Sequence, residues 1–458
     1  MRLTRPVTLL SAALLAMTVV TGGHPAGATV PTVAGVSRGP SAEQLGLPQL
    51  RSPRSFTGFA FDRCVTPSSS DMDVWRTSSP FGGVGVYISG NSRACPESAQ
   101  PYLSPQWVAA QHRQGWRILG IHVGYQAPCF EAGDPTPAKL RMSSIPSVAR
   151  SQGTQAANEA VAKAAYYGLG PGSTLYLDIE WYDRLNSACN QAVLTHVDAW
   201  TDRLHVLDYR SGLYSSASAA IASVDLARAA DPQAWTWPDQ LWFAWGNGRA
   251  DLDGKPYLSD TAWQGARLHQ YQLDVPATYG GTSLTIDRNW LSVGNGSQAR
   301  RQTGTCGTQL SWTTYPARQQ GDSGPRIAAA RCLLLRGGYT RAPVGERLGV
   351  ATVAALRRLQ RDRGLPVTGQ LTDRSWVALL SGGSDTLVKI GSNRQQVWRL
   401  QRALRAAGRN AALTGVFDPG TAATVKAYQS GLGHPVTGVA DSTLWRALAK
   451  GRVGQSAG

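Results

Sequence analysis

The sequence predicts an α/β protein, a (β/α)8 TIM-like barrel followed by two small all-α domains of three helices each. Between residues 56 and 293, eight short strand patterns alternate with longer, helix-compatible segments, which is typical of parallel β/α architecture. Between residues 321 and 450 the pattern changes and repeats itself at a fixed offset. The length, 458 residues, also exceeds what one ordinary core occupies.

The amino terminus has the pattern of a secretory signal peptide. Arg2 and Arg5 are followed by an apolar run over 7–20 and by small residues at 26–28, so we expect cleavage after residue 28. The apolar run is too short to span a bilayer, and no later segment is long enough. We therefore expect a protein that is secreted, extracellular or associated with the cell wall, with no membrane attachment after cleavage. Residues 29–55, rich in proline, read as a linker.

The predicted barrel strands share an alternation of bulky aliphatic residues with small or polar ones. They cover residues 57–62, 83–89, 117–126, 173–180, 211–215, 240–245, 267–273 and 283–287. We expect the aliphatic face of each strand to pack on outer helices, one of which is predicted over 154–167. In the third strand this places Leu119, Ile121 and Val123 outside, and His122 on the inner face.

The fourth strand carries the chemistry that stands out most. Asp178 and Glu180 are two residues apart in a strand, so they point the same way. Neighbouring carboxylates raise each other's pKa, which lets one acid stay protonated while the other is charged. The alternative interpretation is a solvated strand end.

Other predicted strands also end in polar residues on the inner face. Asp62 ends the first strand, Ser89 the second and Asp287 the eighth. In a barrel such ends converge on the C-terminal rim, where these proteins build their sites. Asp62 or Asp287 could instead cap a helix or be a buried, hydrogen-bonded carboxylate.

The six cysteines suggest disulfides, since an even number in an exported chain favours pairing. Cys64, Cys95, Cys129 and Cys189 follow the first four strands in order, so neighbouring loops suggest Cys64–Cys95 and Cys129–Cys189. Cys306–Cys332 is the pair that remains, although the sequence alone permits fifteen connectivities. With no C-x-x-C and no histidine ligand spacing, we expect neither zinc nor another metal or cofactor.

The positive charge is confined to the last third of the chain. Residues 1–293 carry equal numbers of basic and acidic residues, so the net charge of +16 lies entirely in 294–458. A basic module on an exported protein suggests an anionic surface as partner, here phosphate- or carboxylate-bearing wall polymers. Nucleic acid would contradict the export signal. The bland alternative is a merely soluble basic surface.

Successive strand motifs of the barrel carry a family resemblance. They are GFAFDRC, GVGVYISG, WRILGIHVGYQAPC, LYLDIEWYD, YRSGLYSS, LWFAWGNG, RLHQY and TIDRNW. Residues 56–293 resemble a secreted bacterial glycoside-hydrolase-like family, a domain of unassigned function, which is similar to glycoside hydrolase family 25 lysozymes. The resemblance implies that Asp62, Asp178, Glu180 and Asp287 form the site. One departure is Arg63-Cys64 after Asp62, where those lysozymes have D-x-S.

A second linker, 294–320, leads to the repeat. A shift of 69 residues superposes 348–379 on 417–448. The coinciding residues are Thr352/Thr421, Gln360/Gln429, Trp376/Trp445 and the PVTG of 366–369 and 435–438. We expect three short helices in each copy, 321–381 and 387–450. In the second copy, Asp418-Pro419 and Asp441 are helix-start signals.

The repeat resembles the peptidoglycan-binding type 1 domain. The second copy follows the family pattern through Leu400-Gln401, Phe417-Asp418, Thr421 and Tyr428-Gln429. The first copy diverges, with Ala330-Arg331 in place of L-Q. The alternative is a pair of bundles acting as spacers.

These observations predict a monomeric glycoside hydrolase targeted to wall glycan such as peptidoglycan. Glu180 would be the general acid and Asp178 would stabilise an oxocarbenium-like transition state or orient substrate. Asp62 and Asp287 would hold hydroxyls or assist water. Substrate-binding candidates are Tyr87, His122, Tyr214 and Trp245; the aromatic rings could stack on sugars or simply pack in the barrel. The rival hypothesis is a non-catalytic wall- or glycan-binding protein with a degenerate hydrolase barrel.

Overall fold

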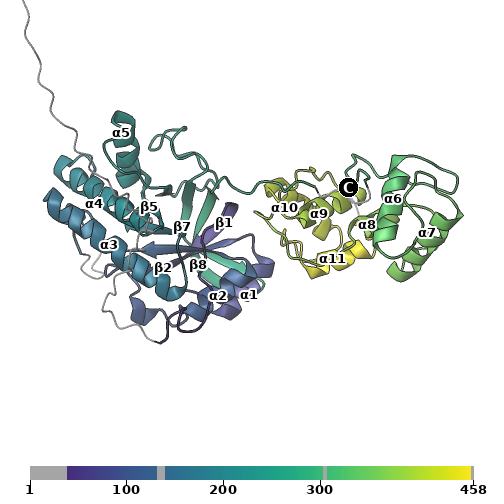
Figure 1. Ribbon diagram of the computed structural model, residues 1–458, viewed down its shortest axis with the longest axis horizontal. Helices are drawn as coiled ribbons and strands as arrows, with labels where there is room; N and C mark the ends of the chain where they lie inside the picture. Colours follow the sequence, from purple (N-terminus) through teal and green to yellow (C-terminus); the bar gives the residue numbers. More distant parts are fainter. Residues whose placement is uncertain (1–38, 132–139, 303–306, 455–458) are drawn as a thin grey trace, which may run out of the picture.

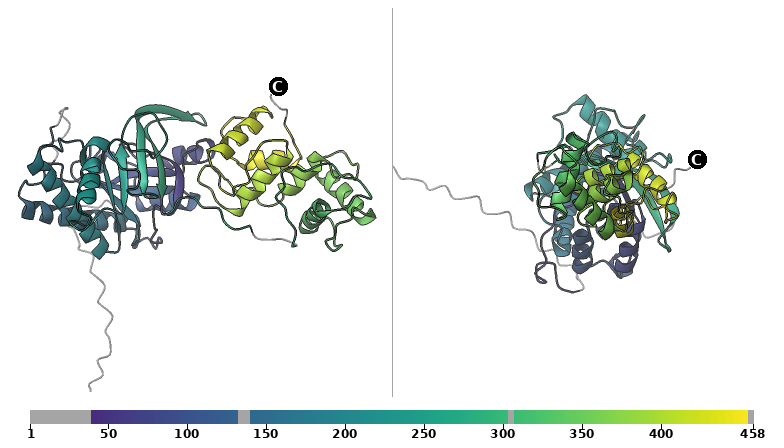
Figure 2. Two further views of the ribbon diagram at one scale, coloured as in Figure 1. Left: turned by 90° about the horizontal axis from the view of Figure 1, so that it is seen from above. Right: turned by 90° about the vertical axis from the view of Figure 1, so that its right-hand side faces the viewer.

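The computed structural model describes residues 39–131, 140–302 and 307–454. These form two lobes at opposite ends of an elongated molecule, a barrel and a group of helices (Figures 1 and 2). The expected signal peptide, residues 1–28, and Cys306 lie outside the described residues. None of the described helices combines the length and hydropathy that crossing a bilayer requires.

Eight strands close into the predicted barrel in sequence order, β1 to β8 (Figure 1). The strands are β1 Phe56–Asp62, β2 Gly83–Ser89, β3 Arg117–His122, β4 Thr174–Ile179, β5 Arg210–Ser216, β6 Gln240–Ala244, β7 Arg267–Tyr279 and β8 Thr282–Val293. The helices of this lobe are α1 Ser69–Ser78, α2 Pro105–Gln114, α3 Pro146–Tyr167, α4 Ser187–Val206 and α5 Ala222–Ala230. Each predicted strand is present, and α3 contains the helix expected over 154–167.

The last strand runs in the opposite direction to the others. β1 to β7 pair in parallel, whereas β8 is antiparallel to both β7 and β1. The cause is the connection, because Gly280 and Gly281, both with positive φ, join β7 to β8 directly. A parallel return needs a crossover of about a dozen residues or more, and this turn is a hairpin. Asp287 therefore lies within β8 and not at a strand end.

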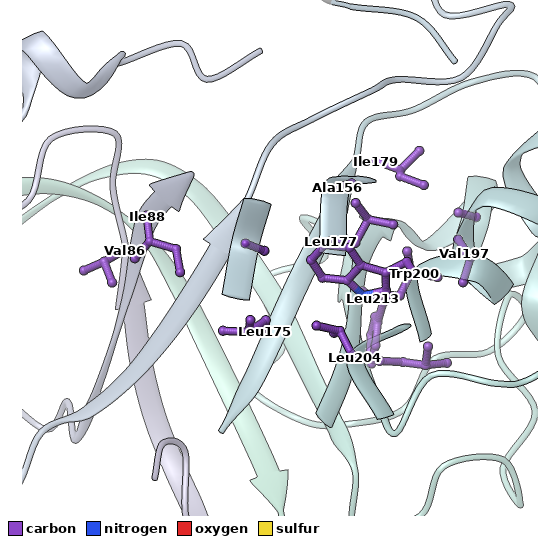
Figure 3. Packing of buried hydrophobic residues seen from close by; sticks show 14 of the residues in the cluster. Val86, Ile88, Ala156, Leu175, Leu177, Ile179, Val197, Trp200, Leu204 and Leu213 are labelled. Atoms are coloured by element: carbon purple, nitrogen blue, oxygen red, sulfur yellow. The ribbon is translucent and has the colours of Figure 1, made fainter. Parts of the chain in front are cut away.

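The aliphatic face of β4 packs outward, as predicted. Leu175, Leu177 and Ile179 belong to one buried cluster with Trp200 of α4 and Ala156 of α3 (Figure 3). The inner face of β4 carries Tyr176, which lies edge-on to Trp242 with ring centroids 5.3 Å apart. A Cβ on Gly212 would lie 2.3 Å from the Tyr176 ring, so only glycine fits beside it. The barrel interior is thus a packed core.

The prediction of which face of β3 turns inward is wrong. Leu119, Ile121 and Val123 lie in the cluster that fills the barrel, whereas Ile118 packs with the outer helices. His122 consequently points outward against Trp200, with ring centroids 5.5 Å apart. A one-residue slip exchanges the two faces of a strand. Aliphatic residues occur on both faces of this strand, Ile118 on one and Leu119 and Ile121 on the other, so alternation does not decide which face turns inward.

The second lobe has three helices in each repeat, as predicted. They are α6 Pro325–Arg336, α7 Val350–Arg363 and α8 Asp373–Leu380, then α9 Gln395–Ala406, α10 Pro419–Ser430 and α11 Ser442–Ala449. Asp418 and Asp441 cap α10 and α11 by accepting from Thr421 N and Leu444 N. Buried side chains of both repeats form one hydrophobic cluster, so the repeats share a core.

Matching glutamines hold matching turns in the two repeats. Gln360 accepts from Gly369 N at 2.8 Å, and Gln429 accepts from Gly438 N at 2.9 Å. Gln401 of the L-Q motif makes the same kind of bond with Gly415 N. Its counterpart Arg331 instead donates to two loop carbonyls, those of Arg347 and Pro343. In the first repeat, hydrogen bonds from Arg331 to loop carbonyls therefore take the place of the glutamine–glycine bond of the second repeat.

The second repeat is attached to the end of the barrel where the parallel strands begin. Lys389 is 2% exposed, and its Nζ donates to the carbonyls of Arg76 and Ser79 at 2.8 and 3.2 Å. Ser297 after β8 donates to the carbonyl of Gly391 at 2.8 Å. The opposite end of the barrel, where Asp62 and Asp178 lie, faces away from this attachment.

Candidate functional site

The four predicted carboxylates meet at one end of the barrel. Asp178, Glu180 and Asp287 line a cleft of about 490 Å³. Asp62 is not among the lining residues; it is 1% exposed, and Asp287 is its direct partner across the β1–β8 ladder. Asp178 is 3% exposed, whereas Glu180 is half-buried. Three of the four predicted carboxylates therefore line the cleft, together with the exposed Asp274, and Asp62 lies behind Asp287.

Gln270 of β7 connects the two aspartates. Its Nε2 lies 3.3 Å from each carboxylate oxygen of Asp62 and 3.2 Å from Oδ2 of Asp287. Its Oε1 accepts from the hydroxyl of Tyr214 at 2.8 Å, which fixes the orientation of the amide. One uncharged side chain thus holds two acids and a tyrosine in place.

Asp62 has further donors around it. Asn289 Nδ2 lies 2.7 Å from Oδ2, and the Tyr87 hydroxyl lies 3.3 Å from Oδ1. The Oδ1 of Asn289 accepts from the indole of Trp242 at 2.7 Å, so the interior tryptophan orients this amide. The packed barrel core and the acidic pair are therefore one connected network.

Burial dominates the protonation of the pair. Desolvation, and then the charge of Asp287, raise the pKa of Asp62 to about 8, against the lowering effect of the bonds from Asn289, Gln270 and Tyr87. Burial also raises the pKa of Asp287, and the nearby charge of Asp274 adds to it. Two such close carboxyls titrate as a unit, with one proton retained near neutral pH.

The Asp178/Glu180 segment is held through its backbone by Gln126. Gln126 Nε2 donates to the carbonyl of Asp178 at 2.9 Å, and its Oε1 accepts from Glu180 N at 2.8 Å. Both bonds belong to a single buried amide in the segment after β3. The two acids are consequently positioned by a neighbouring strand segment as well as by their own.

Two of the four substrate-binding candidates line the cleft. Tyr87 and Tyr214 are both lining residues. Burial, and then the surrounding carboxylates, raise the pKa of each phenol. Both hydroxyls therefore stay protonated and able to donate hydrogen bonds at neutral pH.

The other two candidates lie elsewhere. His122 is 1% exposed, its Nδ1 lies 2.8 Å from Ser89 Oγ, and burial lowers its pKa to about 3. Trp245, just after β6, is half-buried against Tyr257 with ring centroids 5.7 Å apart. Neither residue lines the acidic cleft. His122 points outward from β3 and so lies away from the cleft, and Trp245 packs at the edge of the cluster between the barrel and its helices.

Sequence reasoning missed the three amides Gln126, Gln270 and Asn289. Asn289 is two residues beyond Asp287 in β8, so strand periodicity could have found it. Gln270 sits in β7, in a stretch considered only as a strand. Gln126 follows the regular part of β3 and carries no sequence signal of its own.

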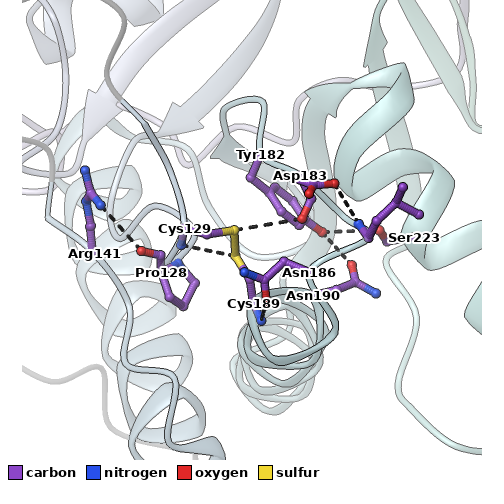
Figure 4. The surroundings of a disulfide bond; sticks show 10 residues. Pro128, Cys129, Arg141, Tyr182, Asp183, Asn186, Cys189, Asn190 and Ser223 are labelled. Atoms are coloured by element: carbon purple, nitrogen blue, oxygen red, sulfur yellow. Dashed lines mark hydrogen bonds between the residues drawn. A yellow bond between two sulfur atoms is a disulfide. The ribbon is translucent and has the colours of Figure 1, made fainter.

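Two disulfides close the loops around the cleft, as predicted. Cys64–Cys95 joins the loops after β1 and β2, and both residues line the cleft. Cys129–Cys189 ties the segment after β3 to the start of α4 (Figure 4). Beside it, Tyr182 donates to Asn190 at 2.8 Å, which anchors the loop after Glu180. Disulfides of this kind are typical of exported proteins.

The fold and the acidic cleft define a glycoside hydrolase-like barrel joined to a helical module. Residues 73–291 match the family model described as Rv2525c-like, glycoside hydrolase-like domain, and residues 323–379 and 393–448 match that of a putative peptidoglycan binding domain. The barrel therefore matches the Rv2525c-like, glycoside hydrolase-like family model, and the second lobe matches the peptidoglycan-binding model twice. Both resemblances found in the sequence are confirmed.

Solved structures add distant similarities to the barrel. An uncharacterized B. stearothermophilus protein shares 18% identity over 50% of this chain and 94% of its own, with a TM-score of 0.34. The Mycobacterium tuberculosis Tat-secreted protein Rv2525c, in complex with L-tartrate, shares 15% identity over 51% of this chain and 94% of its own, with a TM-score of 0.32. A family 25 glycosyl hydrolase from Bacillus anthracis shares 13% identity over 53% of this chain and 92% of its own, with a TM-score of 0.31. Comparison with curated proteins gives no match.

Proposed function

We propose that the protein is an exported hydrolase that cleaves peptidoglycan or a related wall glycan. The observation that carries the proposal is the cleft itself, in which Asp178, Glu180 and Asp287 come together beside two tyrosines. Glycosidic bonds are broken by paired carboxyl groups, and a cleft of about 490 Å³ accommodates sugar units. The two peptidoglycan-binding-type domains support a wall polymer as the substrate.

Glu180 is the proposed general acid. It is half-buried in the wall of the cleft, and Gln126 fixes its backbone, so its carboxyl can reach a glycosidic oxygen. Asp178, buried beside it, would stabilise positive charge that develops on the sugar ring or orient a substrate amide. Asp287 would hold a sugar hydroxyl or a water, with Gln270 and Asp62 fixing its carboxylate.

Localisation and partners follow from the same proposal. The predicted signal peptide would export the chain, and the basic second lobe would hold it on anionic wall polymers. The barrel mouth and the attached second repeat lie at opposite ends of the strands. A protein held by its helical lobe would therefore keep its acidic cleft accessible to glycan.

The test replaces Glu180 by glutamine, which preserves shape and removes the proton. Release of reducing ends from purified peptidoglycan should fall by a factor of about 10²–10⁴. Glu43→Gln, an exposed and equally conservative change, should leave the release unchanged. Co-sedimentation with the same wall material should be equal for all three proteins.

Equal background release by wild type and Glu180→Gln would overturn the hydrolase proposal. If both proteins still co-sedimented with wall, the result would favour a glycan-binding protein with a silent barrel.

A further inference from the structure

A second cleft lies between the two repeats, far from the acidic cleft. Its volume is about 1030 Å³. Its walls come from the C-terminal ends of α7, α10 and α11, the start of α8 and the chain after α11. Both repeats contribute, so neither repeat alone would form this space.

The walls of this cleft, which we call the inter-repeat cleft, are strongly basic. Six cationic side chains line it: Arg361, Arg363, Arg374, Arg446, Lys450 and Arg452. Asp362 is the one acidic lining residue. The negative ends of three helices offset some of the charge, at about half a charge each. The positive charge still exceeds all of these compensations together.

Among the described residues, none of the six cations is paired with an acid. Every ion pair found among the described residues lies in the barrel lobe, and none involves these six. Arg446 donates to Ser442 O and Thr443 Oγ1 of its own helix, so its charge stays uncompensated. Five of the six, all except the half-buried Arg363, are exposed. The cleft therefore offers charge and donors to a ligand from solvent.

The cleft is rigid before any ligand arrives. The repeats share one hydrophobic core, which fixes the two walls relative to each other. Gly451 of the second repeat lies so close to the first that a Cβ there would be 2.6 Å from the carbonyl of Arg374. A preformed site spends no binding free energy on ordering its walls.

We propose that the inter-repeat cleft binds a phosphodiester-linked wall polymer. Five of the six cations are arginine, whose planar guanidinium donates two parallel hydrogen bonds to a phosphate and stays charged at any physiological pH. The cleft is lined by cations from both repeats, which suits a chain that carries more than one negative charge. The choice of a wall polymer rests on the proposed function, whereas the charge of the ligand rests on the cleft alone.

The probe is a fluorescently labelled poly(glycerol phosphate) oligomer, titrated with the full-length protein and followed by anisotropy. The variant combines Arg361→Gln, Arg374→Gln and Arg452→Gln. Its affinity should fall about tenfold or more, because charge-assisted hydrogen bonds are lost. The slope of log affinity against log salt should shrink by about 2, at roughly 0.7 per phosphate contact.

The matched control removes the same charge outside the cleft through Arg341→Gln, Arg347→Gln and Arg358→Gln, all exposed. It should keep wild-type affinity within about twofold. An equal loss in both triple variants would overturn the site, since net charge alone would explain the binding. Equal affinity for polygalacturonate of matched length would overturn the phosphate assignment.

Failure here is separable from failure of the hydrolase proposal. The Glu180→Gln variant should bind the phosphate oligomer as wild type does. The cleft variant should still release reducing ends from soluble peptidoglycan fragments. Loss of that release in the cleft variant would contradict a role confined to binding.

Discussion

Asp62 of β1 lies directly opposite Asp287 of β8, and Gln270 Nε2 lies within 3.3 Å of carboxylate oxygens of both. The two acids belong to antiparallel neighbours, so their side chains meet at one level of the barrel. With burial raising the pKa of both, the pair keeps a proton where isolated carboxyls would lose it. The Asp62/Asp287 pair, next to the Asp178/Glu180 segment, is therefore the part of this site that remains protonated near neutral pH.

The first prediction concerns the pH dependence of stability. The folded protein holds a proton on Asp62 up to about pH 8, whereas the unfolded chain releases it near pH 4. Between these values the folded state binds more protons, so the free energy of unfolding should fall as the pH rises. The slope has a ceiling of about 1.4 kcal/mol per pH unit for one proton. Urea unfolding at pH 4.5, 6 and 7.5 measures it.

Asp62→Asn should flatten this dependence, because the substituted side chain cannot ionise. Glu43→Gln, exposed and distant from the pair, should retain the wild-type slope. An unchanged slope in Asp62→Asn would show that Asp62 is ionised in the folded protein at neutral pH.

The second prediction tests Gln270 as a positioning residue. Gln270→Leu removes the donor shared by Asp62 and Asp287 and the acceptor for Tyr214. The lost bonds stabilise the ionised carboxylates, so without them the pKa of the pair rises and the acid limb of the pH–activity profile should shift to higher pH. Glycan release should fall about tenfold or more, because the acids are no longer held in place. Gln106→Leu, on the exposed side of α2, should change neither. Reduced release with an unshifted profile would assign Gln270 a merely structural role.

Much of this candidate site could be predicted because its acidic residues lie at positions that strand periodicity places on one face. Asp178 and Glu180 share a face by strand geometry, and Asp62 ends a strand whose inner residues are small. The same reasoning failed for the third strand because aliphatic residues occur on both of its faces, and His122 was therefore placed on the wrong face. Asp287 lines the same cleft as Asp178 and Glu180 although its strand runs the other way, and its role stays a prediction.

The amides escaped prediction for a physical reason. Gln126, Gln270 and Asn289 act through hydrogen bonds to groups that are distant in sequence, and an uncharged amide in a strand is common. The shared core of the repeats was equally hidden. A repeat of 69 residues indicates two similar units, but it does not tell whether they pack on each other.

The third prediction concerns the attachment of the second repeat to the barrel. Burial, and then the charges of Arg76 and Arg117, hold the pKa of Lys389 well below its usual range. The unfolded chain therefore binds a proton that the folded protein releases more readily, so stability should rise as the pH rises toward the ordinary lysine pKa of about 10. Lys389→Met should flatten that rise. Urea unfolding at pH 7, 8.5 and 9.5 provides the comparison.

Lys426→Met supplies the control, since this lysine is exposed on α10 of the same repeat. It should leave the rise intact. A rise that persists in Lys389→Met would mean that another base controls the attachment.

The fourth prediction tests whether the repeats unfold together. Gln360→Leu and Gln429→Leu each remove a buried side chain that braces a turn in one repeat. Each should lower the free energy of unfolding by about 1–3 kcal/mol, because the turn amide and its partners lose their bonds. Since both repeats share one hydrophobic core, either change should shift a single common transition. Gln370→Leu, exposed in the first repeat, should shift nothing. Thermal unfolding followed by circular dichroism distinguishes the outcomes, since independent repeats would give two helical transitions with only the mutated one displaced.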